Sequence, residues 1–199
     1  MPKMMSKGFY IAGYLAGYIL SVLLLIIAFV GMIFYYVSPH SDPNDLPWIS
    51  FGLMVLAFLP LIFSIVVYMM FIYRMWAAIQ DGHARMTPGK AVGFMFIPLF
   101  NFYWIFQAFQ GFAEDYNQYL ARRQLNLPRL DEQLFLYYPI AILCTIVPFV
   151  GGLAALAGIV LLVLIISKTC DAVNALATAP RAPITMPNAP VGLFPGKFL

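Results

Sequence analysis

Charged side chains are scarce in this sequence, at 10% of its 199 residues, whereas hydrophobic side chains make up 63%. Several uncharged apolar runs are longer than the roughly 18 residues that mark a membrane helix. This composition excludes an ordinary water-soluble domain and leaves no basis for a nucleic-acid partner. We therefore expect an all-α integral membrane protein that forms one bundle of helices surrounded by membrane lipids.

Cysteine and histidine are also scarce. The two cysteines, Cys144 and Cys170, form neither a disulfide framework nor a metal-binding spacing. His40 and His83 fall in loops that we expect on opposite faces of the membrane, so they cannot both ligate one haem. The sequence contains no nucleophile and base pattern, no HExxH motif, no phosphate loop and no acidic metal cluster. We therefore expect no cofactor, no metal and no enzyme activity.

Four apolar stretches predict helices that cross the membrane: residues 9–37, 48–76, 134–147 and 153–177. The first is too long for the apolar region of a signal peptide, and no cleavage site follows it, so we expect a signal anchor. This stretch contains Gly13 and Gly17, a GxxxG motif that lets another helix approach closely.

The last two predicted helices come from one continuous apolar run, Leu134 to Ser167. As a single helix this run would be roughly 51 Å long, against a hydrocarbon core of about 30 Å. The segment PFVGG, Pro148 to Gly152, supplies proline and glycine near the middle of the run. We therefore expect a helical hairpin that turns there.

The stretch from Pro88 to Leu120 allows two topologies. It either crosses the membrane once, as a helix kinked at Pro98, or it enters over residues 88–97 and returns as a helix over residues 101–123. Thr87 and Pro88 suit a helix start, and Asn101 can cap a second helix after the break.

Charge placement separates these topologies. A single crossing would place Arg122, Arg123 and Arg129 on the outer face, whereas a hairpin keeps every basic residue on one side. The positive-inside rule favours the hairpin, and the single kinked span remains the alternative. We expect four transmembrane helices plus one re-entrant helical hairpin within residues 1–177, with both termini in the cytoplasm.

Polar residues at lipid depth mark candidate functional positions, because each needs a partner there. The return helix carries Asn101, Gln107 and Gln110, and Asp115 extends their face loosely. Tyr103 and Trp104 lie beside them. This face is either a polar path or ligand cradle, or a set of interhelical hydrogen bonds that holds the re-entrant segment.

Further charged residues lie near the inner boundary of the membrane. Arg74, Glu114 and Asp115 either form an ion pair between helices or are solvated helix ends.

The tail, residues 178–199, contains five prolines and cannot continue a helix. We expect it to be extended and to contact a partner subunit. Its apolar anchors are Leu193, Phe194, Phe198 and Leu199.

The segment TPGKAVGFMFIPLFNFYWIFQAFQGF resembles a family of bacterial membrane proteins of about this length, described only as a domain of unknown function. The shared pattern is a proline and glycine pair, Ala-Val-Gly, Phe-Ile-Pro, an asparagine and a tryptophan. Here these are Pro88, Gly89, Ala91, Val92, Gly93, Phe96, Ile97, Pro98, Asn101 and Trp104. The likeness extends loosely to CDAVNAL and covers about half of the chain. It implies a bacterial cytoplasmic membrane and no particular activity.

These features favour a non-catalytic accessory or structural subunit of a larger bacterial membrane complex, with other membrane subunits or further copies of the chain as partners. A small channel or transporter that uses the re-entrant hairpin is the alternative. A membrane enzyme is the third and least supported reading.

Overall fold

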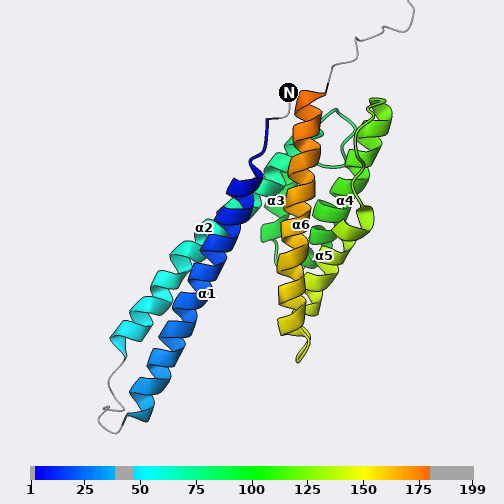
Figure 1. The fold of residues 1–199 in the computed structure, drawn as a ribbon. Helices are drawn as coiled ribbons and strands as arrows, with labels where there is room; N and C mark the ends of the chain where they lie inside the picture. Colours follow the sequence, from blue (N-terminus) through cyan, green and yellow to red (C-terminus); the bar gives the residue numbers. More distant parts are fainter. Residues whose placement is uncertain (1–2, 39–46, 180–199) are drawn as a thin grey trace, which may run out of the picture.

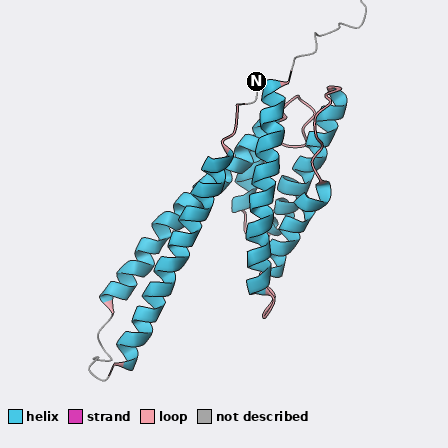
Figure 2. Cartoon of the chain, in the orientation of Figure 1, coloured by secondary structure: helices cyan, strands magenta, loops and turns pink. Residues whose placement is uncertain are grey.

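A computed structural model describes residues 3–38 and 47–179 of the chain. Helices make up most of this part, and it contains no strand (Figure 2). The helices follow the sequence expectations to within three residues at each end. They are α1 Lys7–Val37, α2 Trp48–Ala78, α3 Pro88–Gly93, the 3-10 turn η1 Phe94–Phe96, α4 Phe100–Arg122, α5 Glu132–Cys144 and α6 Gly151–Thr178.

Three of these helices are long and apolar enough to cross a membrane. α1 and α2 have 31 residues each and α6 has 28, with mean hydropathies of 2.7, 2.7 and 2.4 over their most apolar windows. This is the pattern of a multi-pass membrane protein. The fourth expected span, residues 134–147, corresponds to the shorter α5, a helix of 13 residues.

Helices α1 and α2 form an antiparallel pair, which we call the arm. In Figure 1 the arm leans away from the other helices toward the end opposite the N-terminus. Small residues bring its two helices close together: a Cβ on Gly17 would lie 2.7 Å from the carbonyl oxygen of Pro60. The Ser64 hydroxyl also donates to the Tyr14 carbonyl over 2.9 Å. The GxxxG motif therefore packs against α2.

After α2 the chain enters α3 and reverses. Thr87 caps α3, its side chain accepting a hydrogen bond from the Lys90 backbone N–H. Leu99, just before α4, has a positive φ of 64°, which is uncommon for a residue with a side chain. The Trp104 indole N–H then donates to the Ala91 carbonyl over 3.1 Å, so α4 runs back beside α3.

The start of α4 differs from expectation. Leu99 is its N-cap and makes no side-chain cap hydrogen bond, so Asn101 does not cap the helix. Asn101 lies one residue inside α4, and its side-chain carbonyl oxygen is buried without a hydrogen-bond partner.

The turn between α5 and α6 also differs in detail. The chain leaves α5 at Cys144 and starts α6 at Gly151, so the expected hairpin is present. The two glycines of PFVGG lie in the first turn of α6 instead of in the loop. Gly151 is required there because a Cβ would come within 2.5 Å of the Thr145 carbonyl oxygen.

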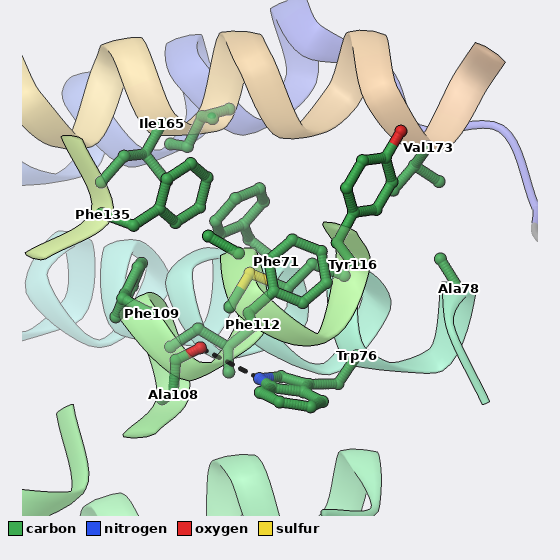
Figure 3. Packing of buried hydrophobic residues seen from close by; sticks show 14 of the residues in the cluster. Phe71, Trp76, Ala78, Ala108, Phe109, Phe112, Tyr116, Phe135, Ile165 and Val173 are labelled. Carbon is green, nitrogen blue, oxygen red and sulfur yellow. Dashed lines mark hydrogen bonds between the residues drawn. The ribbon is translucent and has the colours of Figure 1, made fainter. Parts of the chain in front are cut away.

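The buried core lies where α2, α4, α5 and α6 meet. Figure 3 shows aromatic rings of α2, α4 and α5 packed against Ile165 and Val173 of α6. The Trp76 indole N–H donates to the Ala108 carbonyl over 3.0 Å. Among the described residues, none between 15 and 66 belongs to this core cluster. The outer half of the arm is thus held by contacts between α1 and α2.

Amide side chains secure three loop segments near the N-terminal end of the molecule. Gln80 donates to the Met86 carbonyl, in the segment that leads into α3. Asn117 binds both backbone groups of Leu130 at 2.9 Å, before α5. Asn174 binds both backbone groups of Met5, at 2.7 and 3.0 Å, before α1. An amide side chain near the end of α2, α4 and α6 thus bonds the segment that leads into α3, α5 and α1, respectively.

Candidate functional site

The polar face of α4 is organised around Arg85, which lies in the loop between α2 and α3. The Arg85 Nε donates to Asp115 Oδ1 over 2.8 Å, and its backbone N–H donates to Asp115 Oδ2 over 2.7 Å. Its Nη2 pairs with Glu114 Oε2 at 2.6 Å. Its Nη1 lies 3.5 Å from Gln107 Oε1. One arginine thus bonds three side chains on two turns of α4.

A glycine makes room for this arginine. Gly111 lies on α4 between Gln107 and Asp115, and a Cβ on it would come within 2.9 Å of Arg85 Nη1 and 3.3 Å of Arg85 Cδ. The guanidinium therefore lies directly against the backbone of α4. We call Gln107, Gly111, Glu114 and Asp115 the arginine seat.

The two predicted glutamines belong to this network. Gln107 also donates through Nε2 to the Tyr103 hydroxyl over 3.0 Å. Gln110 donates to Glu114 Oε1 over 3.2 Å. Gln107, Gln110 and Asp115 therefore belong to one network of hydrogen bonds within α4 and between α4 and the loop residue Arg85.

The other predicted site residues lie apart from the arginine seat. Trp104 packs its ring 4.7 Å from that of Phe94 and bonds the α3 backbone. Asn101 lies about four helical turns before Asp115, and its side-chain carbonyl oxygen has no hydrogen-bond partner. The tail residues Leu193, Phe194, Phe198 and Leu199 lie outside the described residues.

Burial differs sharply within the seat. The Asp115 side chain is 6% exposed, whereas those of Arg85 and Glu114 are 32% and 31% exposed. Burial alone lowers the pKa of Arg85, but the hydrogen bonds that Arg85 donates to Glu114 and Asp115 outweigh it, so the pKa is raised. One cation and two carboxylates leave a net charge of −1. Chemically, the site is suited to holding a planar cation between two carboxylates.

Arg85 is the residue that the sequence reasoning missed. The sequence left open whether Arg74, Glu114 and Asp115 form an ion pair or are solvated helix ends, and none of the ion pairs in the described part of the chain involves Arg74. Asp115 itself was the signal, because a buried carboxylate needs a paired charge or hydrogen-bond donors. Along the chain, the loop residue Arg85 is no farther from Asp115 than the helical residue Arg74 is. Only the path of the loop decides which arginine reaches the carboxylate.

The same loop has a second ionic contact with α4. Asp81, whose side chain is 4% exposed, pairs with Arg122 Nη2 at 3.1 Å. Burial raises the pKa of Asp81, but the His83 backbone N–H and the Arg122 side chain together lower it below its ordinary value. The loop from residue 79 to 87 therefore contacts α4 at two places, through the Asp81–Arg122 ion pair and through the contacts of Arg85.

Among the described residues, no group of histidine, cysteine or acidic side chains could hold a metal ion.

Comparison of the chain with protein-family models, with curated proteins and with solved structures finds no match. The resemblance to the bacterial membrane family therefore remains a prediction.

Proposed function

We propose that the chain is a non-catalytic accessory subunit of a larger bacterial membrane complex. The observation that carries this proposal is the arm. Its helices are joined by a close seam of small residues, and the half that lies away from the core exposes large apolar side chains along its length. A rigid, two-helix apolar surface of this kind is suited to packing laterally against the helices of another membrane subunit.

The proposed topology has four spans and a re-entrant hairpin. α3 and η1 together would reach about 15 Å, roughly half of the hydrocarbon thickness. The start of α1 and the ends of α2, α4 and α6 lie at one end of the molecule (Figure 1). Lys7, Arg85 and Arg122 lie at that end, which supports its assignment to the cytoplasm.

In this topology α5 is short for a helix that crosses the membrane. At 13 residues it would extend about 20 Å as a helix. A membrane accommodates a short span by local thinning or by the flanking residues reaching its surface. Cysteine labelling tests the topology: with Gln124→Cys, the hairpin predicts protection from an impermeant thiol reagent added outside, and ready labelling contradicts it.

Purification from native membranes tests the assembly. Wild-type protein extracted in mild detergent should carry stoichiometric protein partners, which mass spectrometry identifies. The α1 stripe Ile19, Leu23 and Ile26 is 50–53% exposed, so its replacement by three alanines should release those partners. The matched control replaces Leu153, Leu156 and Val160 of α6, which are 59–73% exposed, and should retain them.

Two results would contradict the accessory role. A wild-type protein that purifies without any protein partner would leave the arm nothing to bind. Equal loss of partners from the α1 and α6 variants would show that the arm is not the binding surface. A chain that ends at Ala179 tests the tail in the same experiment, and we expect it to bind partners more weakly.

A channel or transporter is the second candidate. The polar face of α4 supports it, together with the buried Asn101 carbonyl oxygen that has no hydrogen-bond partner near the chain reversal. Solute flux into proteoliposomes that depends on Gln107 and Gln110 would favour this candidate. Replacing both glutamines by leucine should leave partner binding intact if the accessory role is right.

A further inference from the structure

The loop between α2 and α3 is held against α4 by contacts that differ in strength and exposure. At its start, Gln80 bonds the Trp76 carbonyl of α2 and the Met86 carbonyl of the loop itself, and Asp81 pairs with Arg122 of α4. At its centre, Arg85 alone bonds both oxygens of Asp115. The burial of Asp115 therefore depends on Arg85 staying in place.

Several features of the arginine seat fit a guanidinium group. Asp115 and Glu114 accept from different nitrogens of one planar fork, at 2.8 and 2.6 Å. Gly111 lets that fork lie flat on the helix. A lysine ammonium carries one point charge and cannot bridge both carboxylates in this manner.

We propose that Arg85 is a latch: while its guanidinium occupies the arginine seat, the loop closes over the polar face of α4, and when it leaves, that face opens to water. The seat acids stand on the rigid helix α4, whereas Arg85 stands in a loop whose residues Gly82, His83 and Thr87 are exposed. In this proposal the loop is the part that moves. The latch does not depend on which function the chain has.

A buried reporter in the loop measures opening. Met86 is 6% exposed, so Met86→Cys, with Cys144 and Cys170 replaced by alanine, should react slowly with a maleimide. Adding Arg85→Ala should increase the labelling rate at least tenfold. Arg85→Lys should give an intermediate rate, and Thr87→Cys in place of the reporter should label quickly in every background.

Chemical rescue tests whether the seat recognises guanidinium. Guanidinium chloride at 20 mM, far below denaturing concentrations, should slow labelling of the Arg85→Ala protein toward the rate with Arg85. Potassium chloride at 20 mM should not. Adding Gly111→Ala places a methyl group in the seat, so guanidinium should no longer slow labelling. Unchanged labelling on removal of Arg85, or rescue by both salts, would overturn the latch.

A double-mutant cycle measures the same fit without a reporter. Gly111→Ala should lower the melting temperature when Arg85 is present, because the new methyl displaces the guanidinium. With alanine at position 85 the same change should be neutral or stabilising, because alanine favours helix over glycine. An equal effect in the two backgrounds would contradict a close-fitting seat.

Discussion

The seam of the arm makes a sharp quantitative prediction for Gly17→Ala. The added Cβ would lie 2.7 Å from the Pro60 carbonyl oxygen and 3.1 Å from Ser64 Cβ, so the two helices must separate by several tenths of an ångström. Overpacking of this kind costs roughly 1–3 kcal/mol. The backbone oxygen cannot rotate away as a side chain does, because it belongs to α2.

Gly52→Ala is the matched control. It makes the same chemical change in a helix of the arm, about one turn after the start of α2, but nothing lies within 4 Å of the new Cβ. Alanine should stabilise that helix by about 0.5–1 kcal/mol relative to glycine. Gly31→Ala should fall between the two, since its nearest neighbour is the Ser50 hydroxyl at 2.8 Å, which can rotate away.

Reversible unfolding in mixed detergent micelles, followed by tryptophan fluorescence, measures all three free energies. The expected order of stability is Gly52→Ala, Gly31→Ala, then Gly17→Ala. If Gly17→Ala is as stable as Gly52→Ala, α1 and α2 do not approach as closely as described. The proposed rigidity of the arm would then lose its physical basis.

Three further predictions concern the opposite end of the molecule. Trp76→Phe should cost about 1 kcal/mol in unfolding free energy, because the buried Ala108 carbonyl loses its donor. Asn117→Ala should accelerate amide exchange at Leu130, whose N–H it accepts, whereas the exposed Gln118→Ala should not. The pKa of Asp81 is lowered from its ordinary 3.8, so its stabilising effect is full above about pH 5 and is lost as the pH falls through the folded value. Asp81→Asn should therefore lower the unfolding free energy at neutral pH and remove part of the fall in stability that wild type shows as the pH drops below about 5. A variant with the same pH dependence as wild type below about pH 5 would refute the assignment.

Most of the helix pattern could be predicted from the sequence, because long apolar runs and prolines determine it locally. Thr87 and Pro88 marked the start of α3, and the break after Phe96 followed from Pro98. The role expected of Asn101 was wrong because a cap requires its backbone just outside the helix. α4 begins one residue earlier, at Phe100, and so includes Asn101.

The site could be predicted only in part. The spacing of Gln107, Gln110 and Asp115 placed them on neighbouring turns of one helix, which is a local property. The arginine that joins them comes from a loop 22 positions before Gln107, so its identity depends on tertiary structure. The fit of glycine at position 111 is also tertiary, because the Arg85 side chain lies where a Cβ would be.

The two ends of the molecule use different packing, and membrane physics accounts for the difference. Within hydrocarbon, helices gain nothing from burying apolar surface, so close approach through small residues must supply the attraction, as between Gly17 and Pro60. Where water is the alternative, burying large aromatic rings is favourable. Trp76, Phe112 and Tyr116 are fully buried, on the helical turns of α2 and α4 that lead to the Asp81 and Arg122 ion pair. If the arm is oriented as proposed, this change from small to aromatic residues puts the water boundary along α2 between Ser64 and Trp76.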